Sequence, residues 1–287
     1  MPRFVLMFAS VSLAAVFAAF TGIVPMSPAT SQPTPATNDG SQCATTNTAF
    51  NVGEKLTYKV YYNLNFVWVP AGEVTFEVKD EGTMYHLVAL GRTYSSYEWF
   101  FKVRDRYESY VDKKTLLPTL SIRDMHEGSF DWYSRQAFDN TAKNVTVLEG
   151  GNLKDAQTTQ HPLKGCAHDI LSIIYYARNV DQNTYRKDDR VPIQVFIDKQ
   201  TWKLNVHYKG KETRRYIRDA GYYNTYSFSP ELIKGGTFKD TNQMLVQVSD
   251  DANRVPLEIN SPLSVGSVKV VLVDAKGLRN PTTAKVK

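Results

Sequence analysis

"YVDKKTLLPTL", residues 110–120, has the pattern of two β-strands joined by a turn. Asp112 begins the polar part, and an Asp carboxylate accepts hydrogen bonds from backbone amides two residues further on, which favours a turn. Pro118 stands where the next apolar strand starts, a position at which a missing N–H is tolerated. The segment therefore predicts a hairpin whose lysines are solvated turn residues rather than a basic binding site.

The same pattern returns twice along the chain. "FIDKQTWKL" at 196–204 repeats residues 111–115 at four of five positions when Val and Ile are equated. "VSDDANRVPLE" at 248–258 places Asp250 six residues before Pro256, the same distance that separates Asp112 from Pro118. We interpret the three copies as one hairpin design used repeatedly.

In other segments apolar and polar residues alternate with period two, as in a strand with one buried face and one solvent-exposed face. In "GEVTFEVK" at 72–79, Val74, Phe76 and Val78 share one face, and in "TWKLNVHY" at 201–208, Trp202 and Tyr208 share a face with the apolar residues between them. Similar runs give about a dozen strands, and their short polar connections favour antiparallel neighbours. The 17 tyrosines and 14 phenylalanines of this 287-residue chain agree with a β-rich core.

One segment has the period of a helix. In "CAHDILSIIYYARNV" at 166–180, apolar residues recur at three- and four-residue spacing, with Asp169 in the first turn and Arg178 near the last, as the helix dipole favours. The pattern predicts a helix of about 12 residues. The predicted fold class is mainly β: a strongly curved antiparallel sheet or incomplete β-barrel, with one helix packed on its concave side.

The chain divides into four parts by composition. Residues 1–29 resemble an export signal, with Arg3 before an apolar run and a small-residue cleavage site at 27–29. An uncleaved membrane anchor is the alternative, although the run of 17 residues is at the lower limit for spanning. Residues 30–49 form a polar linker, residues 50–275 a single β domain, and residues 276–287 a flexible tail.

The chain has two cysteines, Cys43 and Cys166. In an exported protein we expect them to form a disulfide, which would stabilise the fold by about 4–5 kcal/mol in the chain-entropy model; two free thiols are the alternative. Cys43 follows Gln42 rather than a small residue and lies far from the apolar run, so we do not expect a lipoprotein. The predicted location is the periplasm or the outer envelope.

Several quoted segments together resemble a known family: "FNVGEKLTYKVYY", "PAGEVTFEV", "FKVRDRYESYVDKKTLLP", "EGSFDWYSRQAFD", "HDILSIIYYARN" and "GTFKDTNQMLVQVSDDANRVPLEINSPLSVGSVKV". They are similar, in order over about residues 50–275, to the domain of unknown function 3108, in the form common among exported proteins of the Bacteroidetes type. The resemblance implies export and a strand-rich fold, and it brings no established activity.

A second resemblance concerns the hairpins alone. An aspartate turn followed by a proline and an apolar-faced strand is similar to hairpins of the LolA/LolB-type lipoprotein carriers. Those proteins are half-barrels whose concave apolar face accepts acyl chains. This resemblance is one of fold, and it implies a lipid ligand only by analogy.

Charge and motif content exclude several classes of protein. The net charge of +5 is mild, and basic residues alternate with acids instead of forming a stripe, so we expect no nucleic-acid partner. The chain has no G-x-S-x-G motif and no recognisable catalytic triad. The donors of "HPLKGCAHD", residues 161–169, match no standard zinc spacing, so we predict neither a metal site nor a cofactor.

The candidate ligand-binding residues are three arginines and two aromatic residues: Arg104, Arg106, Arg135, Trp202 and Tyr208. The arginines lie in strand patterns with alternating opposite charges, which suits either a solvated face held by salt bridges or a clamp for an anionic head group. Glu108 and Asp131 are the alternative catalytic pair, of the kind that cleaves glycosidic bonds.

We therefore expect a non-catalytic exported protein that binds an apolar ligand such as a lipid or acyl chain. Two alternatives stay open at this point. One is a protein that binds or cleaves carbohydrate by means of aromatic residues and the Glu108/Asp131 pair. The other is a protein that assembles with envelope partners through its hairpins or strand edges.

Overall fold

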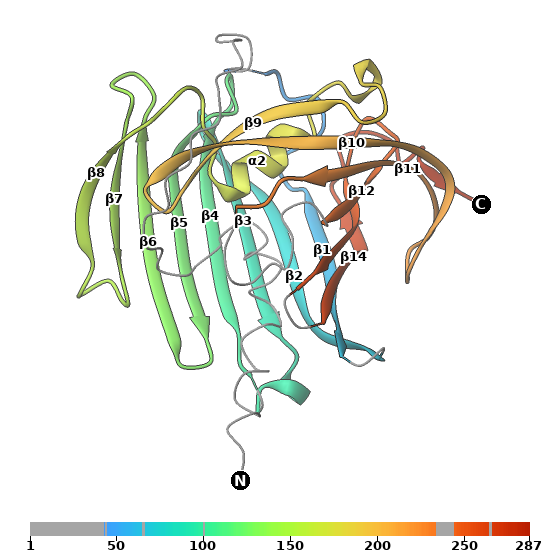
Figure 1. Cartoon of the computed structure of the whole chain (residues 1–287), viewed down its shortest axis with the longest axis horizontal. Helices are drawn as coiled ribbons and strands as arrows, with labels where there is room; N and C mark the ends of the chain where they lie inside the picture. Colours follow the sequence, from blue (N-terminus) through green and yellow to red (C-terminus); the bar gives the residue numbers. More distant parts are fainter. Residues whose placement is uncertain (1–42, 44, 65–66, 100, 234–243, 264–265) are drawn as a thin grey trace.

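A computed structural model describes residues 43, 45–64, 67–99, 101–233, 244–263 and 266–287. Within these ranges, fifteen strands belong to one antiparallel sheet (Figure 1). The strands are β1 (Lys55–Leu64), β2 (Val67–Glu81), β3 (Met84–Thr93), β4 (Arg104–Asp112), β5 (Pro118–Glu127), β6 (Phe130–Asp139), β7 (Asn144–Gly150), β8 (Gln157–Pro162), β9 (Arg190–Ile197), β10 (Gln200–Ile217), β11 (Gly221–Pro230), β12 (Leu245–Ser249), β13 (Pro256–Pro262), β14 (Ser267–Lys276) and β15 (Lys285–Val286).

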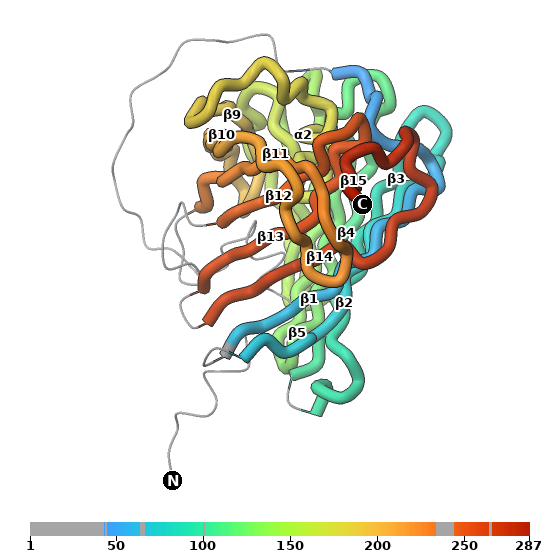
Figure 2. The backbone as a smooth tube through the Cα atoms, turned by 90° about the vertical axis from the view of Figure 1, so that its right-hand side faces the viewer, coloured from blue at the N-terminus to red at the C-terminus, as the bar shows by residue number. Residues whose placement is uncertain are grey.

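The sheet is an open, strongly curved structure. Its strand order runs β8-β7-β6-β5-β4-β3-β2-β1-β14-β13-β12-β11-β10-β9, with β15 added to β11, so β8 and β9 are the two ends. Figures 1 and 2 show the wall of β1–β8 curving around the interior while the β9–β10 hairpin crosses one end of it. Phe196 at the tip of this hairpin packs edge-on against Phe138 of β6, with ring centroids 5.7 Å apart. The predicted fold class is confirmed.

Helix α2 (Ile170–Ala177) packs inside the curve against β3, β4 and β9. Asp169 caps its N-terminus: the carboxylate accepts hydrogen bonds from Leu171 and Ser172 backbone N–H groups, and the Ser172 hydroxyl completes a capping box. The helix has 8 residues, fewer than predicted, because Asp169 precedes the first turn and Arg178 ends the last. No helix in the described ranges is long and apolar enough to span a bilayer.

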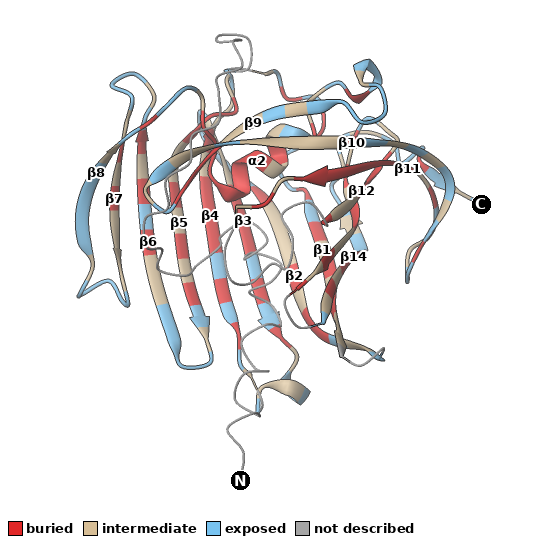
Figure 3. Ribbon diagram, in the orientation of Figure 1, coloured by how far each residue is buried: buried red, intermediate tan, exposed pale blue. Residues whose placement is uncertain are grey.

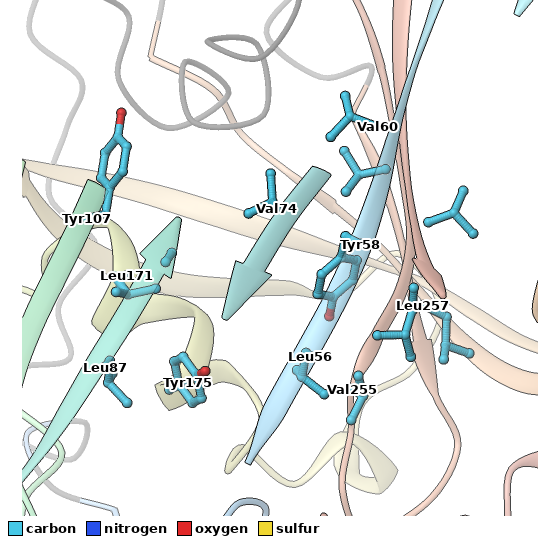
Figure 4. Packing of buried hydrophobic residues seen from close by; sticks show 14 of the residues in the cluster. Leu56, Tyr58, Val60, Val74, Leu87, Tyr107, Leu171, Tyr175, Val255 and Leu257 are labelled. Carbon is cyan, nitrogen blue, oxygen red and sulfur yellow. The ribbon is translucent and has the colours of Figure 1, made fainter. Parts of the chain in front are cut away.

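The sheet has an inner face, which we define as the face that α2 contacts, and an outer face. Tyr107, Ser109 and Val111 of β4 point to the inner face, and the Ser109 hydroxyl donates a hydrogen bond to the Asp169 carboxylate at 2.6 Å. Buried residues concentrate around α2 and the strand segments that face it (Figure 3). Leu171 and Tyr175 of α2 belong to one apolar cluster with inner-face residues of β1–β4 (Figure 4).

The three repeated segments all form hairpins, but their turns differ in chemistry. Asp112 accepts hydrogen bonds from the backbone N–H groups of Lys114 and Thr115, as predicted. At the second copy, Asp198 and Lys199 both have positive φ in a two-residue turn. At the third, Asp251 rather than Asp250 accepts from the backbone, at the N–H of Asn253. The repetition therefore lies in the strand–turn–strand arrangement and not in one turn type.

The β domain extends beyond both of its predicted boundaries, residues 50 and 275. The end of the predicted linker packs into the fold: Asn47 and Ala49 are buried, and the Asn47 carboxamide oxygen accepts from the Ala49 and Phe50 N–H groups. The predicted flexible tail also docks, because β15 pairs with Tyr222 and Tyr223 of β11 and Ala284 is buried. These short segments gain hydrogen bonds that a free chain end lacks. Residues 1–29 and most of the linker lie outside the described residues.

Candidate ligand-binding site

A cavity of about 430 Å³ lies on the inner face, between α2 and the β9–β14 part of the sheet. This volume is typical of sites that bind small molecules. Aliphatic and aromatic side chains make up most of its wall. They include Leu56, Tyr58, Phe76, Ile173, Ile174, Tyr176, Ala177, Val180, Tyr185, Val191, Ile193, Val206, Phe228, Val246, Val248, Ile259 and Val270.

Strand register explains why the wall is apolar. Phe228 of β11 pairs with Val246 of β12, which pairs with Ile259 of β13, which pairs in turn with Val270 of β14. Directly paired residues project from the same face, so this row places four apolar side chains side by side. The helix contributes the opposite wall through Ile173 and its neighbours.

Three charged residues line the cavity near the C-terminal end of the helix, namely Arg178, Asp181 and Arg254. Arg178 is fully engaged. Its guanidinium binds the Glu54 carboxylate through two contacts, Nη1–Oε1 at 2.6 Å and Nη2–Oε2 at 2.8 Å. Nε donates to the Asn253 carbonyl oxygen and Nη2 also donates to that of Ala49. Although burial favours the neutral form, the Glu54 carboxylate raises the pKa of Arg178. This charge is therefore held by the protein and is not available to a ligand.

A second polar group lies elsewhere on the inner face, where β4, β5 and β6 run together. Arg123 of β5 pairs with Tyr107 of β4 on one side and with Ser134 of β6 on the other. The Arg123 side chain is almost completely buried, and its one ion-pair partner among the described residues is Asp198, 3.7 Å from Nη2. Its Nε and Nη1 atoms have no hydrogen-bond partner within the described part of the chain.

Two carboxyl groups accompany Arg123 on this face. Asp105 is buried, and its Oδ1 accepts a hydrogen bond from the His126 backbone N–H at 3.1 Å. Burial, followed by repulsion from the Glu127 carboxylate, raises the pKa of Asp105 to about 8. Burial also raises the pKa of Glu127. The raised pKa favours the protonated form of Asp105, which offsets less of the Arg123 charge than a carboxylate would.

The three predicted arginines lie on the other side of the sheet. Arg104 and Arg106 alternate along β4 with the inner-face residues Asp105 and Tyr107, and they are exposed. Arg135 pairs with Ile122, which pairs with Glu108, so it shares the outer face with them. The structure therefore does not bring these arginines to the apolar cavity, because a strand sends successive side chains to opposite faces.

The predicted aromatic residues do lie on the inner face. Trp202 packs in the cluster that joins α2 to β9 and β10, and its indole N–H donates to the Ile197 carbonyl oxygen. Tyr208 is buried against Phe228, with ring centroids 5.3 Å apart. Neither is among the described residues that line the cavity, but both belong to clusters with residues that do: Trp202 with Ile193, and Tyr208 with Phe228.

Glu108 and Asp131 are separated. Glu108 lies opposite Arg135 across β5, and Asp131 is four residues from Arg135 along β6. Strand spacing and rise therefore put their backbones roughly 16 Å apart. The Glu108 carboxylate binds Arg106 and His86, at 2.6 and 2.5 Å, and although burial opposes it these hydrogen bonds lower the pKa of Glu108. This geometry does not favour a glycosidase pair.

The donors of the 161–169 segment have other roles. Cys166 forms a disulfide with Cys43, at a Cα–Cα distance of 5.1 Å, which confirms the expected pairing. Asp169 caps the helix, and burial lowers the pKa of His168 to about 3. Across the described ranges, no group of three or more His, Cys, Asp or Glu side chains is placed to hold a metal ion.

Sequence reasoning missed Arg123. In "TLSIRDMHE", residues 119–127, charged and apolar side chains occur at both parities, so alternation does not say which face is dry. The hairpin register would have found it, because the Asp112 turn places Arg123 opposite Tyr107. Glu54, the partner of Arg178, gave no signal, since its contact spans 124 positions in sequence.

Comparison with known proteins supports the fold and the family. No curated protein matched this chain. A β-barrel-like protein of the domain of unknown function DUF1849 from Brucella abortus superposes with a TM-score of 0.51 at 7% identity, covering 79% of this chain and 98% of that one. A protein with a YmcC-like fold from Bacteroides fragilis matches at 10% identity over 82% of this chain and 100% of its own, with a TM-score of 0.28.

A family model gives the more direct assignment. The model described as "Protein of unknown function (DUF3108)" matches residues 57–273, which include every strand from β2 to β13 and most of β1 and β14. The cavity wall and the Arg123 group fall largely within this range. The chain therefore belongs to the DUF3108 family.

Proposed function

We propose that this protein is an exported, non-catalytic protein of the cell envelope that holds an apolar ligand, such as a lipid acyl chain, in the inner-face cavity. The observation that carries the proposal is the cavity of about 430 Å³ with its predominantly apolar wall. Burying a chain there would stabilise the complex by about 0.8 kcal/mol per methylene group.

Two further observations support the proposal. The Cys43–Cys166 disulfide suits an oxidising compartment outside the cytoplasm, as does the N-terminal apolar segment. The open, curved sheet with one helix on its concave side is also consistent with the resemblance to LolA/LolB-type carriers. That resemblance is one of architecture.

The test is a binding titration with a neutral apolar naphthylamine dye that fluoresces when it leaves water. We expect saturable binding of one dye per protein. Replacing Ile193, which lines the cavity from β9, by Trp should fill part of the space and weaken binding at least about tenfold.

Leu90→Trp is the matched control, because Leu90 is an exposed apolar residue on the outer face of β3. This variant should bind the dye as the unmodified protein does. Absence of saturable binding, or equal binding by the Ile193→Trp variant, would rule the cavity out as the site. Native mass spectrometry of protein purified from its own envelope would then identify the natural ligand by its mass.

A further inference from the structure

The Arg123 group and the apolar cavity are linked by one cross-strand row of inner-face residues. Leu56 and Phe76, which line the cavity, pair directly with each other across β1 and β2. The same cross-strand row continues through Ala89 and Tyr107 to Arg123. All of these side chains project from the inner face, and Phe76 is three strand spacings, roughly 14 Å, from Arg123.

The residues between the cavity and Arg123 are apolar and belong to the buried core. Ala89, Tyr107 and Met125 are buried members of the same cluster as Leu56 and Tyr58 of the cavity wall. Trp132, which pairs with Met125, packs against this cluster from β6. The row between the cavity and Arg123 is therefore apolar. Because Ala89, Tyr107 and Met125 are buried, a chain that follows the row displaces the groups that cover them.

The Arg123 guanidinium has N–H groups without hydrogen-bond acceptors in the described part of the protein, and these groups indicate what kind of ligand would bind there. A buried guanidinium normally has hydrogen-bond acceptors for its N–H groups, because an unmet charged donor is costly. Nε and Nη1 of Arg123 have no acceptor among the described residues, and Asp198 approaches Nη2 only to 3.7 Å. The missing acceptor is an anionic oxygen, since guanidinium groups match carboxylates and phosphates in geometry and charge.

The neighbouring polar atoms fit the same kind of ligand. Within the described ranges, Oδ2 of Asp105 and Oγ of Ser134 are likewise buried without a hydrogen-bond partner. Burial and the Glu127 carboxylate raise the pKa of Asp105, which favours a protonated carboxyl group that can donate a hydrogen bond. Ser134 also has a hydroxyl donor. Arginine, protonated carboxyl and hydroxyl together form a donor set for an oxyanion.

We propose that Arg123, with Asp105 and Ser134, forms an anion-binding subsite that takes the carboxylate or phosphate group of an amphiphile whose chain occupies the inner-face cavity. This inference rests on the proposed function and specifies its ligand class. It replaces the outer-face arginines with an inner-face arginine as the head-group contact. The ligand class is thus an anionic amphiphile.

The test compares two ligands of equal chain length, dodecanoate and dodecanol, as competitors of the neutral dye. With the unmodified protein at neutral pH, dodecanoate should displace the dye at a concentration at least about tenfold lower than dodecanol, because a charged hydrogen bond contributes about that factor. Arg123→Gln should bring this ratio close to one while leaving displacement by dodecanol unchanged.

Arg135→Gln is the matched control, because Arg135 is exposed on the outer face of the adjacent strand β6. It should keep the full preference for the acid. Thermal unfolding of each variant checks that it is folded, and the acid-to-alcohol ratio of the unmodified protein tests the subsite without any substitution.

Each failure has its own signature. A dye that does not bind the unmodified protein contradicts the cavity and, with it, the subsite. A dye that binds, together with equal displacement by acid and alcohol, contradicts the subsite alone, as does a preference that survives Arg123→Gln. Loss of the preference in millimolar inorganic phosphate would identify a free anion as the occupant and overturn the amphiphile assignment.

Discussion

Arg178 and Arg123 are both buried on the inner side of the sheet, yet their surroundings differ completely. Arg178 is 2% exposed and binds the Glu54 carboxylate and two backbone carbonyl groups. Arg123 is 3% exposed, and its nearest acid among the described residues is 3.7 Å away. The first arginine joins the N-terminal segment, the end of the helix and the β12–β13 turn. The second has a single ion pair, with Asp198 of the β9–β10 turn.

The difference separates a structural charge from a candidate functional one. A buried charge persists in a fold when partners compensate its loss of hydration, as Glu54 does for Arg178. Where the protein supplies no such partner, a ligand that does so gains the interaction on binding. The comparison predicts opposite responses when each arginine site is altered.

The largest effect should follow from Glu54→Gln. This change removes the negative charge opposite Arg178 and leaves a buried cation without its counterion, which costs roughly 3–5 kcal/mol of unfolding free energy. Urea denaturation measures the loss. The double variant Glu54→Leu with Arg178→Met should recover part of it, because two apolar residues leave no charge buried. A single variant as stable as the parent would refute the structural role.

A smaller effect should come from the pH dependence that Asp105 creates. Its pKa rises from the ordinary 3.8 to about 8 on folding, so between these values the folded state keeps a proton that the unfolded state has lost. Stability therefore falls as pH rises through this window, by up to about 1.4 kcal/mol per pH unit. Asp105→Asn should flatten the profile measured by denaturation at several pH values.

Asp188→Asn serves as the control for this profile, because Asp188 is well exposed. It should leave the slope unchanged. The pKa of Glu127 is raised in the same direction, and its titration is linked to that of Asp105, so the difference between the two variants reports the Asp105–Glu127 pair. An unchanged slope in Asp105→Asn would show that Asp105 is ionised in the folded protein at neutral pH.

The smallest effect on stability should follow from Arg123→Met. Removing a buried charge that lacks close partners should leave the unfolding free energy within about 1 kcal/mol of the parent value, or increase it. Denaturation in the absence of ligand measures this value. A loss as large as that of Glu54→Gln would make Arg123 a structural residue and remove the contrast between the two arginines.

Much of the architecture was predictable because it depends on local patterns. Alternation over 72–79 and 201–208, the aspartate turn at Asp112 and the helical period after Asp169 each involve residues within a few positions of one another. The disulfide was predictable for a different reason, since two cysteines allow only one pairing. The packing of residues 45–49 and of the C-terminal segment was not predictable, because polar composition does not reveal that a segment docks on a distant strand such as β11.

The apolar nature of the candidate site was predictable from the sequence, but its charged residues were not. Alternation places Trp202 and Tyr208 on the dry face, and both belong to clusters with residues that line the cavity. The same rule groups Arg104, Arg106 and Arg135 on one face, but it does not say whether that face looks toward α2 or away from it. The alternation rule did not identify Arg123, because its segment has charged residues at both odd and even positions.

Short-range periodicity, turn chemistry and simple counting are enough to predict the strand-rich architecture, the position of the helix, the repeated hairpins and the cysteine pair. They do not predict which face of the sheet is concave or which arginine is buried there. Each strand has two faces that alternation treats alike, and the choice between them follows from the curvature of the whole sheet and the docking of α2.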